Sequence, residues 1–173
     1  MTDENWGGPV RDDRDPIARA RRNWEDAGWG GEIADGMEAV TSVMRAHQIM
    51  LARVEQELKP FGLTFARFEL LRLLAFTRHG ELPISKASDR LQVHVSSTTS
   101  AIARLVDADL VERRPHPTDG RTTLVAITDA GRDRVECATA ALNTVFADIG
   151  MPAEQSRALV TAIRSLRAAH GDF

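Results

Sequence analysis

Near the middle of the 173-residue chain, five consecutive small side chains carry hydroxyl groups, at Ser96-Ser97-Thr98-Thr99-Ser100. Residues of this kind are poor in helix interiors but suit a helix whose first turns enter a groove, because they allow close approach. Their hydroxyl groups can donate to base edges and to phosphate oxygens, and a helix N-terminus favours phosphate. The run predicts a DNA-reading helix, although a Ser/Thr-capped surface helix would have the same composition.

A second group of polar residues surrounds a turn signal, Asp119-Gly120. A guanidinium group on a protruding turn, here Arg121, can enter an A·T-rich minor groove, where the potential is most negative. Asp119 either orients Arg121 through a salt bridge or accepts hydrogen bonds from turn amides. An isolated loop arginine is commonly an ordinary solvated charge, but other cations accompany this one. The candidate DNA-contacting residues are Ser96, Ser97, Thr98, Thr99, Ser100, Arg104 at the DNA backbone, Arg113, Asp119 and Arg121.

Two short helices and a hairpin must position these residues. Ser85 is expected to cap a first helix, and only about four residues separate it from a second helix over residues 95–108, which is the helix-turn-helix pattern. Residues 111–114 and 123–127 are rich in strand-forming side chains and flank the Asp-Gly turn. Thr64 is expected to cap an earlier helix that ends near Thr77. The order of these elements predicts a winged helix-turn-helix.

The clearest periodicity of the chain lies over residues 33–61, where apolar side chains recur every three or four positions. This spacing is a heptad seam on a long helix that ends before Pro60. A seam of this length on a small domain favours a partner helix, and hence a homodimer, over a core helix of a monomer. Its one polar member, His47, is interpreted as an interface histidine rather than a ligand contact or pH sensor. The seam comprises Ile33, Met37, Val40, Met44, His47, Leu51, Val54, Leu58 and Phe61.

Helices are also predicted at both ends of the chain. Residues 1–14 are polar and acidic and are expected to be mobile. Asp15 and Pro16 then begin a short arm helix, which carries Trp24 and ends at the glycines from Gly28 onward. Toward the C-terminus, a helix begins in the Thr-Asp-Ala-Gly sequence at residues 128–131, and Pro152 opens the last helix.

Composition excludes several classes of protein. With 22 Lys and Arg against 25 Asp and Glu, the formal net charge is −3, so any DNA-binding charge must be concentrated on one face. No apolar run is long enough for a membrane span, and we expect no secretory signal and a cytoplasmic location. The single cysteine, Cys137, is expected to be a small buried filler rather than a redox switch. The scattered histidines and the lack of catalytic motifs predict no metal, no cofactor and no enzymatic activity.

The stretch from Leu63 to Gly131 resembles the MarR (multiple antibiotic resistance regulator) family of winged-helix transcriptional regulators. The hydroxyl run leading into residues 103–113, the wing residues 117–121 and residues 124–131 carry the resemblance, and the order of elements extends it to residues 33–170. It implies a mainly α (α+β) fold with long N- and C-terminal dimerisation helices. It also implies a recognition helix in each major groove, Arg121 in the minor groove, and repression that a small, often anionic aromatic, ligand releases.

The chain departs from the family pattern at three places. Asp109 stands where the family usually has glycine, and Asp tolerates the left-handed conformation better than most residues. Ser100 occupies a position at which many members carry arginine, so we expect one DNA contact of the family to be missing and the operator to differ. The arm helix with Trp24 looks like that of the urate-responsive branch of the family. However, Glu69 stands where the pocket of that branch has Asp, so the resemblance does not predict urate as the ligand of this chain.

The resemblance also implies a small-ligand pocket between the dimer helices and the DNA-binding lobe. Two phenylalanines with a few polar groups nearby would suit a small organic ligand. An ordinary core position is the alternative for each candidate. The candidate ligand-binding residues are Trp24, His47, Phe65, Phe68, Glu69 and Arg72.

These predictions divide the chain into four segments. Residues 1–32 are a flexible N-terminus with an arm helix, 33–62 a dimerisation helix, 63–128 the DNA-binding lobe, and 129–173 the C-terminal dimerisation helices. The expected function is a homodimeric repressor of a pseudo-palindromic operator. The alternative is a helical dimer that binds small molecules or proteins and whose DNA-binding lobe is vestigial, because residues 85–123 carry six Lys and Arg against five Asp and Glu.

Overall fold

The computed structural model describes residues 14–173, so the predicted mobile segment lies, except for its last residue, outside the described residues. The described chain forms two compact units, one up to Leu51 and one over Ala52–Phe173. No helix in this described part combines the length and hydropathy that a membrane crossing requires. The elements are α1 (Pro16–Asp26), α2 (Glu32–Leu58), the 3-10 turn η1 (Lys59–Phe61), α3 (Phe65–Phe76), β1 (Glu81–Pro83), α4 (Ile84–Leu91), α5 (Val95–Asp107), β2 (Val111–Pro115), β3 (Thr123–Ile127), α6 (Asp129–Ala147) and α7 (Ala153–Ala169).

The first unit consists of α1 and most of α2. Helix α1 begins as predicted, because the Asp15 side chain accepts a hydrogen bond from the Ile17 N–H at 2.9 Å. One guanidinium nitrogen of Arg21 lies 2.6 Å from an Asp35 oxygen and 2.7 Å from a Glu38 oxygen, which ties α1 to α2. Among the described residues of this unit, Ala34 alone is buried. Ion pairs thus link α1 to α2, while the apolar side chains of α1 stay at least partly exposed.

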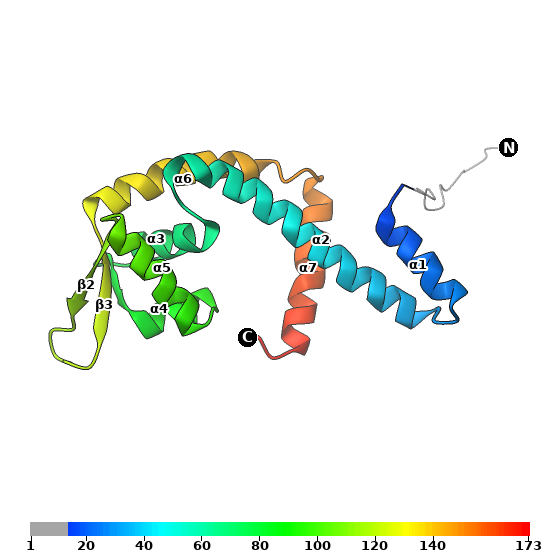
Figure 1. Ribbon diagram of the computed structural model, residues 1–173, viewed down its shortest axis with the longest axis horizontal. Helices are drawn as coiled ribbons and strands as arrows, with labels where there is room; N and C mark the ends of the chain where they lie inside the picture. The colour runs from blue at the N-terminus through cyan, green and yellow to red at the C-terminus, as the bar shows by residue number, and fades with distance from the viewer. Residues whose placement is uncertain (1–13) are drawn as a thin grey trace. The chain divides into compact units, whose positions relative to one another are not determined.

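The second unit contains a three-stranded antiparallel sheet in the order β1-β3-β2. Val111 of β2 lies opposite Ile127 of β3, which confirms the predicted hairpin. Strand β1 adds to the other edge of β3, with Leu82 opposite Val125. Figure 1 shows β2 and β3 projecting beyond the helices as the wing.

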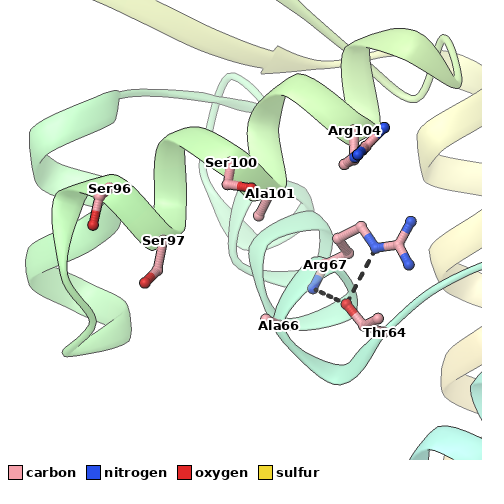
Figure 2. Close-up of a pocket in the computed structure, with 8 residues that line it drawn as sticks. All are labelled: Thr64, Ala66, Arg67, Ser96, Ser97, Ser100, Ala101 and Arg104. Atoms are coloured by element: carbon pink, nitrogen blue, oxygen red, sulfur yellow. Dashed lines mark hydrogen bonds between the residues drawn. The ribbon is translucent and has the colours of Figure 1, made fainter.

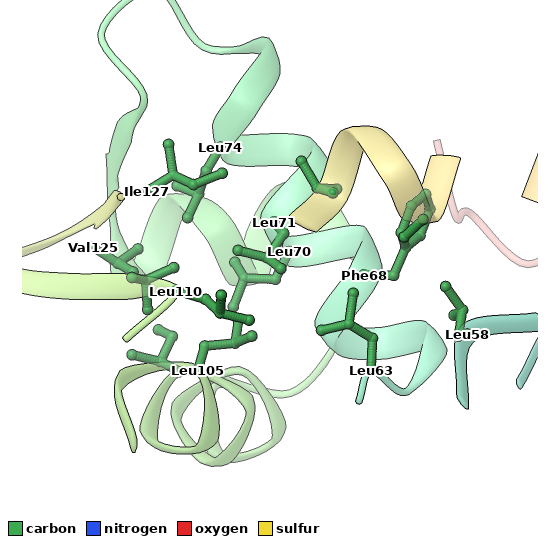
Figure 3. Close-up of a cluster of buried hydrophobic side chains, with 14 of the residues drawn as sticks. Leu58, Leu63, Phe68, Leu70, Leu71, Leu74, Leu105, Leu110, Val125 and Ile127 are labelled. Carbon is green, nitrogen blue, oxygen red and sulfur yellow. The ribbon is translucent and has the colours of Figure 1, made fainter. Parts of the chain in front are cut away.

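Helix α3 supplies the centre of the core of this unit. It contacts α4, α5, α6 and the strands β1 and β3, so its side chains are covered from several directions. Figure 3 shows leucines of α3 between side chains of the sheet and of α5. Burial of side chains of this size is the main favourable term in folding. The largest fully buried side chains are Leu58, Leu70, Leu71, Leu74, Ile102, Leu105, Val125, Val135 and Leu142.

The junction between the wing and α6 depends on two special backbone positions. The Thr128 hydroxyl accepts a hydrogen bond from the Gly131 N–H at 3.0 Å, which caps α6 as predicted. A Cβ atom on Gly131 would lie 2.1 Å from the Leu110 carbonyl oxygen, so only glycine fits there. Asp109 has a φ of 56°, the left-handed conformation expected of it.

Two sequence predictions about helices are wrong in part. Helix α4 begins at Ile84 after Pro83, without a side-chain cap, so Ser85 lies inside the first turn and is not the cap. The heptad seam also does not face a partner along its whole length, because Val54 and Leu58 are buried in the core of the second unit. Phe61 lies in η1 and packs against the same core. The last three seam positions are thus used within the chain.

Candidate nucleic-acid interface

Helix α5 separates a buried stripe from an exposed polar face. Its N-cap, His94, makes no side-chain capping bond, and the helix begins at Val95. The buried stripe has the spacing i, i+4, i+7, which is one face of an α-helix. The stripe consists of Thr98, Ile102 and Leu105. The exposed residues include Ser96, Ser97, Thr99, Ser100 and Arg104.

The assignment of Thr98 as a DNA contact is wrong. Its side chain is 2% exposed, and its hydroxyl oxygen is buried with no hydrogen-bond partner. The reason is positional, because Thr98 continues the apolar stripe that packs α5 against the lobe. The neighbouring Thr99 is exposed, but its hydroxyl donates to the Val95 carbonyl oxygen at 2.8 Å. The hydroxyl groups of the run that are both exposed and unengaged are therefore those of Ser96, Ser97 and Ser100.

An open groove of about 590 Å³ runs between α5 and the N-terminal end of α3. Figure 2 shows the serines of α5 on one side and side chains from residues 64–67 on the other. Arg67 and Arg104 lie toward the same end of the groove. Its lining residues are Thr64, Ala66, Arg67, Ser96, Ser97, Ser100, Ala101 and Arg104.

Arg67 is a site residue that the sequence analysis missed. Its Nε–H donates to the Thr64 hydroxyl at 3.1 Å, which holds the guanidinium group at the groove. In the part of the chain that the structure describes, neither Arg67 nor Arg104 forms an ion pair with a carboxylate. Thr64, identified as a helix cap, also accepts from the Arg67 backbone N–H at 3.4 Å. A capping threonine three residues before an arginine, here Thr64 before Arg67, could therefore have identified Arg67 from the sequence.

The wing turn is organised by Asp119. One carboxylate oxygen accepts the Arg121 backbone N–H at 3.0 Å, and the other accepts the Thr122 hydroxyl at 2.7 Å. The Thr122 hydroxyl and then the Arg121 amide lower the pKa of the Asp119 carboxyl group. Two roles were considered for Asp119, a salt bridge to Arg121 and acceptance of hydrogen bonds from turn amides, and the structure shows the second. The side chain of Arg121 is left exposed near the tip of the wing.

The cations of the wing differ in how they are paired. Arg114 is bound to Glu112 and lies 3.7 Å from Glu81, so its charge is compensated on the sheet. Arg113 is exposed, and no described carboxylate pairs with it. Two uncompensated cations, Arg113 and Arg121, thus remain on the wing.

The six candidate ligand residues are divided between the two units. Trp24 and His47 belong to the first unit, and the other four lie on α3 in the second. Phe68 is part of the buried core. Arg72 fastens α3 to α6, because its guanidinium lies 2.7 Å from a Glu136 oxygen and donates to the Val135 carbonyl at 2.9 Å. These contacts assign Phe68 and Arg72 a packing role.

A small cavity of about 40 Å³ lies beside Glu69, between α3 and α5. Burial raises the pKa of the Glu69 carboxyl group above its usual value. A cavity that binds benzene measures about 150 Å³, so an aromatic ring does not fit in this space. Whatever occupies the cavity is no larger than a few water molecules.

Cys137 is exposed on α6, so the expectation of a buried filler is wrong. The apolar face of α6 is formed by Val135, Ala138 and Leu142, and Cys137 lies on the other side of the helix from this stripe. Across residues 14–173, no group of three His, Cys, Asp or Glu side chains is arranged to hold a metal ion.

Comparison with known proteins gives consistent matches. The model of the MarR family matches residues 61–122. A MarR family transcriptional regulator from Streptomyces coelicolor, known at near atomic resolution, is 48% identical, with a TM-score of 0.73 over 80% of this chain and 97% of that one.

Two further solved structures share the fold at lower identity. A second Streptomyces coelicolor regulator, solved in complex with DNA, is 20% identical, with a TM-score of 0.69 over 79% of this chain and 88% of that one. An Escherichia coli MarR mutant, complexed with operator DNA, is 19% identical, with a TM-score of 0.70 over 79% of this chain and 99% of that one.

Among curated proteins, the transcriptional repressor IacR of Pseudomonas putida is 33% identical over 92 residues, which are 53% of this chain and 54% of that protein. The chain spans between about half and two thirds of the length of the curated relatives that it matches.

Proposed function

The chain belongs to the MarR family of transcriptional regulators, and we propose that it is a homodimeric repressor that binds a pseudo-palindromic operator in double-stranded DNA. The observation that carries the proposal is the exposed face of α5 beside two arginines, Arg67 and Arg104, that no described carboxylate neutralises. Phosphate groups supply much of the affinity for DNA, and unpaired guanidinium groups are suited to bind them.

Each exposed candidate contact residue has a role in this proposal. Ser96, Ser97 and Ser100 read or position α5 at base edges and phosphates in the major groove, together with Thr99. Arg104 and Arg113 contact the DNA backbone. Arg121 enters the minor groove, and Asp119 maintains the turn that presents it. In a two-fold dimer, the two half-sites lie about one helical turn, or roughly 10 bp, apart.

The proposed dimer is supported by apolar side chains that the described chain leaves uncovered. In the first unit, Ile33, Val40 and Met44 of the seam are 62%, 59% and 65% exposed. In the second unit, Phe146 of α6 and Val160 of α7 are 51% and 58% exposed. Apolar surface arranged in helical stripes favours burial against another helix. We propose that a second copy of this chain covers these stripes, with the exposed faces of residues 33–62 and 129–173 as the dimerisation surface; Val54, Leu58 and Phe61 belong to the core of the second unit instead.

We also propose that a small ligand, of the anionic aromatic kind, weakens operator binding. The resemblance to a family whose members are commonly released by such ligands supports this proposal. A ligand acts only if it binds the two states with different affinity. A panel of aromatic acids, followed by melting temperature, tests the proposal, and no shift with any member would count against an effector of this kind.

The deciding experiment is a fluorescence anisotropy titration of the full chain with the promoter fragment beside its own gene, at two salt concentrations. Nanomolar binding to this fragment, with far weaker binding to random DNA, is the expected result. The variant Arg121→Ala should weaken operator binding by about 1–3 kcal/mol, because it loses the minor-groove contact. Unchanged binding would exclude this role of the wing.

Equally weak binding to both DNA fragments would overturn the proposed repressor. It would favour the alternative function, a helical dimer that binds small molecules or proteins and carries a vestigial DNA-binding lobe.

A further inference from the structure

Two apolar side chains are exposed where α5 begins, on a surface that is otherwise polar. Val93, in the turn before the helix, is 42% exposed, and Val95, the first helical residue, is 53% exposed. An exposed valine is unremarkable on its own. Val95 differs from an ordinary exposed valine in its place at the N-terminal end of the helix proposed to read DNA.

Thr99 extends this apolar surface by one helical turn. Residues four apart on an α-helix are neighbours on one face, so Thr99 lies next to Val95. The Thr99 hydroxyl donates to the Val95 carbonyl oxygen at 2.8 Å and is therefore engaged with the backbone. The Thr99 hydroxyl hydrogen is thus not available to an outside donor contact, whereas its methyl group is free to make an apolar contact. We call the exposed carbons of Val95 and Thr99 the methyl strip.

The first two turns of α5 contain no side chain that can make a bidentate contact to a base. Residues 95–100 are only valine, serine and threonine, whereas guanine is read by Arg or Lys and adenine by Asn or Gln. A serine hydroxyl both donates and accepts, so it discriminates poorly between bases. In the major groove, the one apolar feature among the four base pairs is the 5-methyl group of thymine.

We propose that the methyl strip recognises thymine in each half-site through its 5-methyl group, and that Val95 and Thr99 are specificity-determining residues. The proposal rests on the proposed function, because it requires α5 to enter the major groove. It assigns the serines and arginines around the groove mainly to positioning, and the methyl strip to the choice of base.

The test uses a duplex selected by the full-length protein from a randomised pool, and the same duplex with deoxyuridine in place of every thymidine. Deoxyuridine pairs as thymidine does and lacks only the methyl group. We expect the wild type to lose about fourfold in affinity for each contacted methyl, the value of one buried carbon group. Val95→Ala and Thr99→Ser each remove apolar carbon, and Thr99→Ser keeps the hydroxyl. In the double variant, the difference between the two duplexes should disappear.

Ser97→Ala is the matched control, because it removes a groove hydroxyl and leaves the methyl strip intact. It should lower affinity for both duplexes by the same factor. Melting temperatures should be unchanged in all variants, because the altered side chains are exposed.

Three outcomes would contradict these proposals. Tight, specific binding that is equal for the thymidine and deoxyuridine duplexes would overturn the proposed role of the methyl strip, and the proposed repressor function would still hold. The proposed role of the methyl strip would also be overturned if the double variant kept the full difference in affinity between the two duplexes. Failure to select any duplex over random DNA would overturn the proposed function itself.

Discussion

The two units of the chain hold their helices together by different means. In the second unit, Leu70, Leu71 and Leu74 of α3 are fully buried between α5, α6 and the sheet. In the first unit, α1 has no buried residue, and Arg21 joins it to α2 through Asp35 and Glu38. An isolated helix of 11 residues is marginal in water, and exposed ion pairs add little. The DNA-binding lobe thus has a core of its own, whereas the first unit lacks one, which is why we expect a second copy to supply the missing apolar contacts.

The strongest test of this difference replaces one apolar side chain in each unit. Leu71→Ala should lower the free energy of unfolding by about 2–5 kcal/mol, because it leaves a cavity in a fully buried position. Met44→Ala, at a position 65% exposed, should leave the lobe intact and weaken self-association. Urea denaturation followed by circular dichroism measures the first effect, and sedimentation at several protein concentrations measures the second. If Met44→Ala destabilised a monomer as much as Leu71→Ala does, the distinction between the units would fail.

A second test compares arginines that are paired differently. Arg67 is fixed by Thr64 and pairs with no described carboxylate, so its charge is available to phosphate. Arg67→Gln should weaken operator binding and reduce the slope of log affinity against log salt by about 1. Arg78→Gln, at an exposed position beyond the other end of α3, is the matched control and should change neither quantity. An unaltered slope in Arg67→Gln would remove this residue from the interface.

Arg21 should behave in the opposite way, because its charge is used within the protein. Arg21→Gln removes the pairs to Asp35 and Glu38 and should lower the stability only slightly, because exposed ion pairs contribute little. The near-ultraviolet circular dichroism of Trp24 and Trp29, whose ring centroids are 5.4 Å apart, should change as α1 loosens. The salt dependence of DNA binding should stay as in the wild type, and a lower slope would show that Arg21 binds DNA instead.

Features that depend on residues close together in the sequence were predictable. Asp15, Thr64 and Thr128 cap their helices as expected, and Asp119 accepts hydrogen bonds from the wing turn. In each case the donor lies two or three residues from the acceptor, so the side-chain type and its place before a helix or in a turn are sufficient. Asp109 adopts its left-handed conformation for the same local reason.

Features that depend on which side of a helix a residue occupies were not predictable from residue type. Thr98 belongs to a hydroxyl run, but helical phase directs it into the core with Ile102. Cys137 is exposed because helical phase places it on the side of α6 away from the buried stripe. Arg67 becomes a groove residue only because α3 and α5 meet in three dimensions. A sequence pattern gives periodicity, whereas the choice of covered face depends on the neighbouring elements.

Replacing a carboxylate by an amide should change the melting temperature in opposite directions in the two units, and this is the smallest effect that we expect. Burial raises the pKa of Glu69, so the native state binds its proton more tightly than the unfolded chain does. Between the usual value of 4.5 and the raised value, the free energy of unfolding therefore falls as pH rises, and above both values the whole penalty is present. Glu69→Gln should accordingly raise the melting temperature slightly at pH 7 relative to wild type, and this gain should shrink as pH falls toward 4. Glu38→Gln, which loses its pair with Arg21 at 2.7 Å, should lower the melting temperature at pH 7. Differential scanning calorimetry of both variants across this pH range measures the two changes in melting temperature. A loss of stability in Glu69→Gln at pH 7 would mean that the Glu69 charge has a stabilising partner in the lobe, as the Glu38 charge has in the first unit.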